Sequence, residues 1–300
     1  MTATAPVPAP VPTPEPAPRP AGRRRRRRGG RWTIAERLSA GWLVLLVGGM
    51  LVLPPLRGID PLDIGAESRF AKFGAEHWLG ADNLGRDLLA RALDGAQVSV
   101  LIGVGSVLIA ALVGVPLGML SAYYGGPVAA VISFVVDVIL AFPGLVLALG
   151  LASFLGASVT NVMIAITVPM FPVFVRLARA QTLALLETEY LEASEVIGTP
   201  VLSIMRRDVL PNIAEAILAF GFVSIGRAIL IEGSLSFLGI GVPRTQPTWG
   251  GMINEGRIYM TTDPLLILVP GAFLLLTILS LNLISDRFLV DGDPATGARA

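Results

Sequence analysis

The sequence predicts an all-α membrane protein with six transmembrane helices. Of its 300 residues, 53% are hydrophobic and only 15% are charged, and the mean hydropathy is +0.71. Such a chain has too little polar surface to cover a water-soluble globule, whereas a helical bundle surrounded by lipid needs no such cover. Six apolar stretches follow one another along the chain, and they cover residues 38–56, 98–122, 128–151, 159–175, 213–240 and 264–284.

The residues before the first span predict a disordered cytoplasmic tail over 1–31. Met1 to Gly22 alternate Ala, Pro, Val and Thr, a composition that cannot bury a core. Arg23 to Arg28 then form a run of six arginines. Such a run can bind nucleic acid or anionic lipid, but directly before an apolar segment it is typical of an anchor that keeps the N-terminus in the cytoplasm. No small-x-small cleavage site follows, so we expect an uncleaved anchor rather than a signal peptide.

Turn residues separate the first three spans. The first span is expected to stop at Pro54-Pro55, and together with the loop that follows it makes up residues 32–97. The second span has no charged residue, and Tyr123 and Tyr124 follow it where an aromatic belt would lie. Gly125-Gly126-Pro127 then predicts a turn into the third span, which we expect to be one helix. Residues 98–294 form the expected transmembrane core, and 295–300 form a C-terminal tail.

The even number of spans predicts that both termini lie in the cytoplasm. The alternation then places the segments 57–97, 152–158 and 241–263 outside and the segment 176–212 inside. The first outer loop also carries five basic residues, so the charge of the loops supports this orientation only in part. The N-terminal arginines decide it, because the first helix usually sets the orientation. Prolines within the spans predict kinked helices, and these are Pro116, Pro143, Pro169 and Pro172.

Four charged residues fall within the predicted spans, and they are Asp137, Glu215, Arg227 and Glu232. Each costs about 2.5 to 3.5 kcal/mol near a helix centre on insertion scales, so each must face protein or water rather than lipid. Asp137 and Glu232 are therefore candidates for the lining or gate of a pathway, with hydrogen bonding between helices as an equally good interpretation of Asp137. Arg227 and Glu232 are five residues apart and poorly placed to pair. The role of Arg227 stays open.

The composition excludes several chemistries. The chain has no Cys, so it forms no disulfide, thiolate nucleophile or Cys-based metal site. His77 is the only histidine, and Lys72, the only lysine, is followed by Phe73. A Walker A phosphate loop needs Gly-Lys-Ser/Thr and is therefore absent. We expect this chain to bind no cofactor, so any ATP that drives it must bind to another chain.

The polar segment between the fourth and fifth spans has its own helical pattern. Acidic residues from Glu187 onward fill the early turns of a predicted helix, which Gly198 and Pro200 end. A second helical piece over 201–209 is expected to end at Leu210-Pro211-Asn212. A compact cytoplasmic knob and an ordinary connecting loop both fit this pattern.

This segment resembles the EAA motif of the binding-protein-dependent ABC importer permeases, E-A-A-x3-G followed by I/V-L-P. The matching residues are Glu192-Ala193-Ser194, Gly198 and Val209-Leu210-Pro211, with Ser194 in place of the third Ala. In that family the motif forms a coupling helix, which sits in a cleft of the ATP-binding subunit. The resemblance implies that this chain couples to an ATPase through Glu189, Tyr190, Glu192, Ala193, Ser194, Gly198, Leu210 and Pro211.

Further segments are similar to the dipeptide and oligopeptide permeases of the DppC/OppC type. Residues 77–87 resemble their H-x-L-G-T-D-x-x-G-R-D stretch, with Ala81 in place of Thr. The residues of this outer-loop motif are His77, Gly80, Asp82, Gly85, Arg86 and Asp87. Residues 232–241, 247–250 and 282–286, and Asp137 with the segment 140–143, are also similar to that family. The matches cover most of residues 40–294, and residues 1–31 lie outside them.

The residues in and directly after the outer-loop motif predict three structural features. His77 has no second His or Cys with which to share a metal, so we expect it to pack the loop. Asp82, Arg86 and Asp87 can pair and hold the loop against the mouth of the bundle. Residues 88–94 predict a short helix that lies in the membrane interface, because their leucines fall on one face.

The resemblance implies a type I ABC importer permease (MetI-like) bundle with a cytoplasmic coupling helix, in the cytoplasmic membrane of a bacterium. It implies as partners a second, homologous permease, two ATPase subunits that bind ATP and Mg, and an extracytoplasmic substrate-binding protein. Membrane lipid is a further partner, and nucleic acid is not. Di- and oligopeptides are the leading cargo, with nickel chelates or glutathione as alternatives on the same architecture. The chain itself is not expected to be an enzyme.

Two other classes of protein fit the residues less well. Gly156-Ala157-Ser158 resembles the G-x-S element of rhomboid-type intramembrane proteases, but that chemistry needs a His base near the serine, and His77 belongs to another segment. A channel or passive scaffold would not need the cytoplasmic segment 192–211. Both are therefore weaker interpretations than an importer permease.

Overall fold

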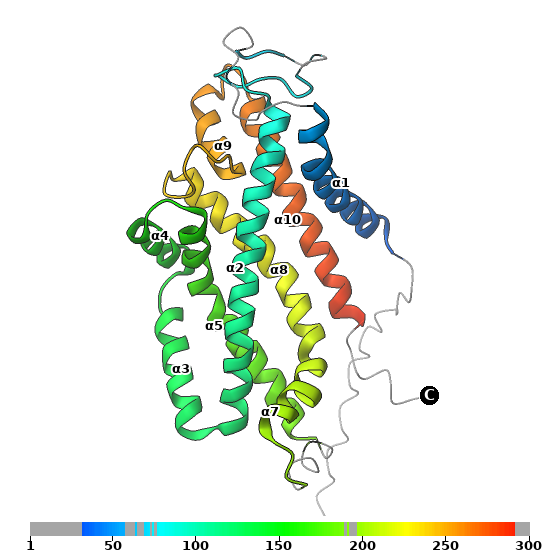
Figure 1. The fold of residues 1–300 in the computed structure, drawn as a ribbon, viewed down its shortest axis with the longest axis vertical. Helices are drawn as coiled ribbons and strands as arrows, with labels where there is room; N and C mark the ends of the chain where they lie inside the picture. The colour runs from blue at the N-terminus through cyan, green and yellow to red at the C-terminus, as the bar shows by residue number, and fades with distance from the viewer. Residues whose placement is uncertain are drawn as a thin grey trace, which may run out of the picture. The chain divides into compact units, whose positions relative to one another are not determined.

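The computed structural model describes residues 32–57, 64, 69–72, 74, 77–188, 191 and 197–291, and these are helices joined by turns (Figure 1). The α-helices are α1 (Ile34–Arg57), α2 (Leu88–Tyr124), α3 (Gly126–Leu140), α4 (Gly144–Leu155), α5 (Val159–Leu186), α7 (Val201–Ile204), α8 (Leu210–Phe237), α9 (Trp249–Gly256) and α10 (Leu265–Asp291). A π-helical turn, Met205–Val209, precedes α8, and a 3₁₀ turn, Arg257–Tyr259, follows α9.

Among the described residues, five segments are long and apolar enough to cross a membrane: Ile34–Leu53, Leu88–Tyr124, Val159–Leu186, Val201–Phe237 and Leu265–Ser285. The pair α3 and α4 passes the same test together and makes a sixth span if it is counted as one. The predicted all-α membrane fold is thereby confirmed.

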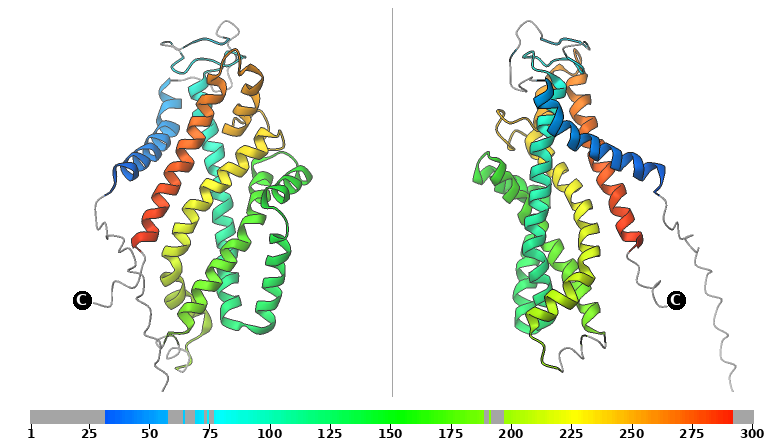
Figure 2. Two further views of the ribbon diagram at one scale, coloured as in Figure 1. Left: turned by 180° about the vertical axis from the view of Figure 1, so that it is seen from behind. Right: turned by 45° about the vertical axis from the view of Figure 1, so that its right-hand side comes forward.

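The long helices run side by side and leave two distinct ends (Figures 1 and 2). Helix α2 packs against both α5 and α8, and α10 packs against α8 and α1. Helix α9 and residues 77–87 lie at one end, which we call the α9 end. The turn between α2 and α3 lies with α7 at the opposite end, which we call the α7 end.

The main core lies where α2 meets α5. Small residues of α2, Ala110, Gly114 and Gly118, face α5, on which Phe174 and Ala178 are fully buried. Small side chains let two helix backbones approach closely, which is the usual way helices pack in a membrane. The close contact between α2 and α5 therefore depends on the glycines of α2.

The third span is broken, contrary to the expectation of one helix. Helices α3 and α4 are bent by 86° at the break over residues 141–143. Pro143 has no N–H for the helical ladder and its ring excludes the preceding turn, so the helix ends before it and α4 starts at Gly144. The predicted kink at Pro143 is thus a sharp corner.

Two span boundaries lie well outside their expected positions. Helix α2 begins at Leu88 because Asp87 caps it, so residues 88–94 are its first turns and not a separate interfacial helix. Helix α5 continues to Leu186, so Arg176 lies inside a helix that was expected to end at Val175. The charges that suggested these boundaries are neutralised by partners from other helices, as described below.

Two predicted stops are also wrong. Helix α1 reaches Arg57 and so includes Pro54 and Pro55. The piece that begins at Val201 does not end at Leu210-Pro211-Asn212 but passes through the π-helical turn directly into α8. Pro211 is tolerated there because it occupies the first turn of an α-helix, where a missing N–H costs little.

Candidate functional site

A buried ion cluster ties three segments together at the α9 end. The Oδ2 atom of Asp82 accepts a hydrogen bond from Nε of Arg86 at 2.7 Å and a second from Nη1 of Arg91. Glu255 of α9 accepts from Nη2 of the same two arginines, at 3.1 Å and 2.9 Å. Asp82 and Arg91 are each only 3% exposed. Two carboxylates and two guanidinium groups therefore hold residues 82–86, α2 and α9 in one arrangement.

The backbone around Asp82 favours its charged form. Burial by itself raises the pKa of Asp82, but two backbone N–H groups, those of Arg86 and Leu84, and the charges of Arg91 and Arg86 outweigh the burial and hold the pKa below its ordinary value. The N–H groups donate to Oδ1 at 3.0 Å and 2.8 Å. Asp82 is therefore charged at neutral pH and pairs with the two arginines.

The remaining residues of the outer-loop motif shape the same turn. Nδ1 of His77 lies 3.1 Å from Oδ2 of Asp87, and Oδ1 of Asp87 accepts from the backbone N–H of Ala90 at 2.8 Å. The expected pair of Asp82 with Arg86 forms, whereas Asp87 pairs with His77 and caps α2. Gly80 and Gly85 have φ values of +87° and +80°, which a side chain would strain. The geometry fits the expectation that His77 packs the loop.

Replacing Asp82 is expected to destabilise the protein strongly. In Asp82→Asn, the buried Arg91 loses a carboxylate partner, and breaking one side of a buried pair costs about 3 kcal/mol or more. Thermal unfolding of the purified protein in detergent at neutral pH measures this loss. Asp263→Asn is the matched control, because within the described part of the chain the side chain of Asp263 accepts from the backbone N–H of Leu265, and asparagine can replace it in this role. Equal stability of both variants would contradict the role of the ion cluster.

The difference in stability between the wild type and Asp82→Asn is also expected to depend on pH. The pKa of Asp82 is lower in the folded than in the unfolded protein, so its charge stabilises the fold fully above the unfolded value of about 3.8. This contribution is lost as the pH falls through the lower, folded value. The stability advantage of the wild type over Asp82→Asn should therefore shrink in acid and be constant from about pH 5 upward.

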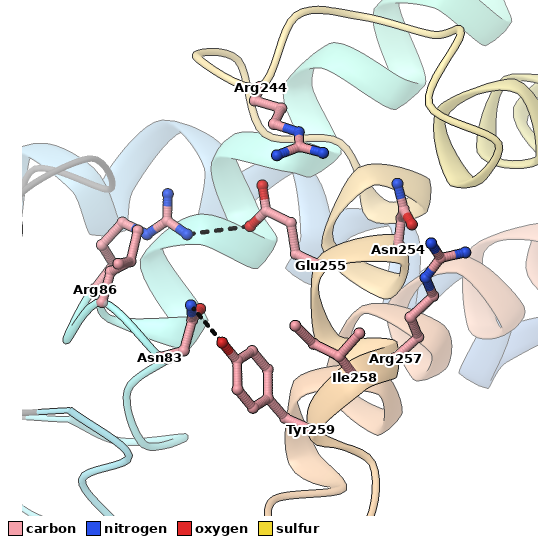
Figure 3. Close-up of a pocket in the computed structure, with 9 residues that line it drawn as sticks. Asn83, Arg86, Arg244, Asn254, Glu255, Arg257, Ile258 and Tyr259 are labelled. Atoms are coloured by element: carbon pink, nitrogen blue, oxygen red, sulfur yellow. Dashed lines mark hydrogen bonds and ion pairs between the residues drawn. The ribbon is translucent and has the colours of Figure 1, made fainter.

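A cavity of about 410 Å³ opens beside the ion cluster (Figure 3). Its walls come from residues 83–86 and from α9 with the turn after it, and the side chain of Asn83 donates to the hydroxyl of Tyr259 at 3.2 Å. Arg244 and Arg257 are exposed and line the same cavity, with the guanidinium of Arg257 5.9 Å from the centre of the Phe237 ring. The α9 end thus presents a hollow with exposed positive charge.

Glu232 lies in a buried hydroxyl network near the α9 end of α8. The side chain is 0% exposed, and its carboxylate accepts from the hydroxyls of Ser99 at 2.8 Å and Ser236 at 2.7 Å. The hydroxyl of Ser99 in turn accepts from the backbone N–H of Trp249 at the start of α9. Glu232 therefore links α2, α8 and α9, and its role in a pathway or gate stays a prediction.

The network predicts a clear order among variants of Glu232. Glu232→Gln keeps an oxygen acceptor, and the serine hydroxyls can rotate to accept from its amide, so we expect stability near that of the wild type. Glu232→Leu leaves buried hydroxyls without their acceptor, at a cost of about 1 to 3 kcal/mol. The thermal stability of the detergent-purified protein measures both. A leucine variant as stable as the glutamine variant would show that the hydrogen bonds do not hold α9.

An ion pair joins α3 to α5 in the middle of the bundle. Nη2 of Arg176 donates to Oδ1 of Asp137 at 2.6 Å, and the two side chains are 60% and 61% exposed. At about 1.5 Å per residue, Asp137 lies about 17 Å from the first residue of α3, and Arg176 lies about 26 Å from the first residue of α5. Both interpretations of Asp137 therefore keep support, since it bonds to another helix and also lies on an exposed face.

Most of the predicted coupling residues fall outside the described residues, namely Glu189, Tyr190, Glu192, Ala193 and Ser194. Gly198 is exposed and has a φ of +81°, in a turn that follows the predicted first helix. Leu210 and Pro211 form the first turn of α8 instead of a loop. The contact of this segment with an ATPase stays a prediction.

Sequence reasoning missed several partners of these groups. Arg91 was expected on the surface of an interfacial helix, Arg176 was placed in the cytoplasm, and Ser99 and Glu255 received no role. The only signal for Arg91 and Arg176 was that each charge interrupts an otherwise apolar helical pattern. Pairs such as Ser99 and Glu232 are too far apart in the sequence to be found from it alone.

Ser158, the serine of the protease-like element, has a structural role. Its side chain accepts from the backbone N–H of Asn161 at 3.1 Å and so caps α5. Ser158 is thus a typical N-cap residue.

Comparisons with known proteins identify the family. Residues 114–291 match the family described as "Binding-protein-dependent transport system inner membrane component". The chain is 38% identical over 218 residues to the glutathione transport system permease protein GsiD of Pectobacterium atrosepticum, which covers 73% of this chain and 72% of that protein. It is 36% identical over 261 residues to the probable D,D-dipeptide transport system permease protein DdpC of Escherichia coli K12, covering 87% and 88%.

The family match covers more than half of the chain, and both relatives align over more than two thirds of their length. A permease subunit of this family binds no cofactor and catalyses no reaction, because ATP binds to the partner ATPase. The chain therefore belongs to the binding-protein-dependent transport system inner membrane components, as a multi-pass permease that works with an ATPase and a binding protein.

Proposed function

We propose that this chain is one of two homologous permease subunits of an ABC importer that brings di- and oligopeptides into the cell. The observation that carries the proposal is the exposed ion pair of Asp137 and Arg176 at mid-span. A charged pair is not stable against lipid, so this face must lie against protein or a watery pathway. A second permease on this face would enclose such a pathway between the two subunits.

The cargo is inferred from the relatives. Their names specify glutathione and a D,D-dipeptide, and both are small peptides with charged ends. Glutathione is the second candidate, because several of the similar permeases carry that name. A nickel chelate, the other alternative from the sequence, has no comparable support.

The two ends of the bundle suit different partners. In the orientation predicted from the N-terminal arginines, the α9 end faces outward and the α7 end faces the cytoplasm, together with both termini. Arg244 and Arg257 at the α9 end would attract acidic side chains of a substrate-binding protein. The turn at Gly198, which precedes α7, would dock on an ATPase and pass its closure to α5 and α8 as a rigid-body movement.

Uptake by the reconstituted complex tests this function. The complex of both permeases and the ATPases is placed in liposomes with its binding protein, and uptake of a labelled dipeptide, glutathione and nickel is measured with and without ATP. We expect ATP-dependent uptake of the dipeptide that excess unlabelled peptide suppresses. Uptake of glutathione alone would favour the second candidate, and uptake by this chain without an ATPase would contradict the proposal.

A further inference from the structure

Arg227 is a charged residue in the middle of α8, and no counter-charge pairs with it among the described residues. It lies about 26 Å from the α7 end of that helix and about 15 Å from the other end, at about 1.5 Å per residue. The side chain is exposed, and within the part of the chain that the structure describes it forms no hydrogen bond or ion pair. Glu232 does not act as the counter-charge of Arg227, because it is fully buried and accepts hydrogen bonds from Ser99 and Ser236.

A small cavity of about 90 Å³ lies at Arg227, between α8, α5 and the start of α4. Gly144, Pro169 and Val173 form the wall opposite α8, and Ser224 lies beside Arg227. A water molecule occupies about 30 Å³ in the liquid, so the cavity has room for a group of the size of a carboxylate. Gly144 in this wall is the first residue of α4 and directly follows the corner at Pro143.

The ion pair of Asp137 and Arg176 lies close to this cavity. Val173, in its wall, precedes Arg176 by three residues, which places the two side chains one turn apart on the same face of α5. Asp137 already accepts from Arg176 at 2.6 Å. On this side of α3, α5 and α8, Asp137 pairs with Arg176, and Arg227 adds a positive charge that has no ion pair within the described residues.

We infer that Arg227 binds the carboxylate of the cargo on its way through the permease. A guanidinium at mid-span needs an anion, and its planar fork of N–H groups matches a carboxylate with two parallel hydrogen bonds. Lipid chains offer no such group, whereas every peptide with a free C-terminus does. The inference rests on the proposed function and adds to it a residue that favours cargo with a carboxylate.

A charge-rescue experiment tests the role of Arg227, since the chain contains no native cysteine. Arg227→Cys is expected to lower dipeptide uptake by the reconstituted complex roughly tenfold or more, as expected for loss of a charge-assisted hydrogen bond. Treatment with 2-aminoethyl methanethiosulfonate attaches a positive ammonium group, which supplies the charge without the planar fork, and should restore part of the uptake. Methyl methanethiosulfonate attaches a neutral group of smaller size and should restore none.

Two controls keep this test interpretable. Arg37→Cys replaces an exposed arginine near the start of α1, and its uptake should change with neither reagent. Arg227→Lys keeps the charge but loses the planar fork, so it should retain more uptake than the untreated cysteine variant and less than the wild type. Uptake by the lysine variant shows that the position tolerates substitution if the cysteine variant assembles poorly. Full uptake by Arg227→Cys, or equal rescue by the neutral reagent, would overturn the inference.

A comparison of two cargoes identifies the group that Arg227 binds. Uptake of a dipeptide and of its C-terminal amide is measured for the wild type and for Arg227→Gln, with the same binding protein, so that the selectivity of that protein cancels. We expect the variant to lose roughly tenfold on the free acid and less than about twofold on the amide. Equal losses on both would overturn the inference and indicate an acidic residue of the second permease as the partner. A wild type that imports no peptide would instead contradict the proposed function.

Discussion

Gly118→Ala is expected to lower the thermal stability of the protein by at least several degrees and to reduce the yield of folded protein. A Cβ atom at this position of α2 would lie 2.8 Å from the Cβ of Ala178 and 2.9 Å from the backbone N of Arg179, and the carbonyl oxygen of Val175 is closer still. Two of these three neighbours are backbone atoms of α5 and cannot rotate away. Helices α2 and α5 must therefore move apart. This costs about 1 to 3 kcal/mol for overpacking, or more if the contact between the two helices is lost.

Gly114→Ala should behave similarly, because a Cβ there would lie 2.8 Å from the carbonyl oxygen of Phe171 and from the Cβ of Phe174. Gly48→Ala in α1 is the matched control, since apart from its own helix backbone no atom of the described residues lies within 4 Å of a Cβ at that position. It should be neutral or slightly stabilising, as alanine favours a helix over glycine by about 1 kcal/mol. Size-exclusion chromatography in detergent after heating to a series of temperatures gives the unfolding midpoint of each of the three variants. Equal midpoints for Gly118→Ala and Gly48→Ala would show that α2 and α5 pack less closely than the structure describes.

The number and approximate position of the spans could be predicted because hydropathy depends on composition alone. The boundaries could not, since each error involved a charged residue or a proline whose effect depends on distant contacts. Arg176 marked the end of the fourth span in the sequence, but Asp137 pairs with it and α5 continues. The sequence around Leu140 to Pro143 is apolar both before and after the break. It therefore does not distinguish a mild kink from a bend of 86°.

The candidate site at the α9 end was predictable only in its local part. The pair of Asp82 with Arg86 follows from their spacing of four residues, and the glycines follow from the turns they form. The contribution of Glu255 was not predictable, because it depends on how α9 folds back against α2. Glu232 was expected to face protein because lipid would not tolerate its charge, and its hydroxyl partners became evident only from the packing of α2 and α8.

The largest functional effect is expected at the segment between α5 and α7. Gly198→Asp should leave the amount of protein in the membrane unchanged and abolish ATP-driven uptake of cargo, while ATP hydrolysis by the complex no longer responds to the loaded binding protein. No atom of the described residues lies within 4 Å of a Cβ at Gly198, so the permease itself has space for the new side chain. The loss would arise where the ATPase is proposed to dock. Glu192→Lys, which reverses a charge of the same predicted motif, should give the same result.

The backbone at Gly198 offers a second explanation, and a further pair of variants separates the two. Its φ of +81° lies in the left-handed region, where an ordinary side chain costs about 1 to 2 kcal/mol and asparagine costs least. If docking matters, Gly198→Asn should fold normally and still fail to transport, because its side chain occupies the contact surface. If only the conformation of the turn matters, Gly198→Asn should transport better than Gly198→Ala, although the side chain of alanine is smaller. Normal uptake by the asparagine and aspartate variants together would reject this turn as the point at which the ATPase moves the permease.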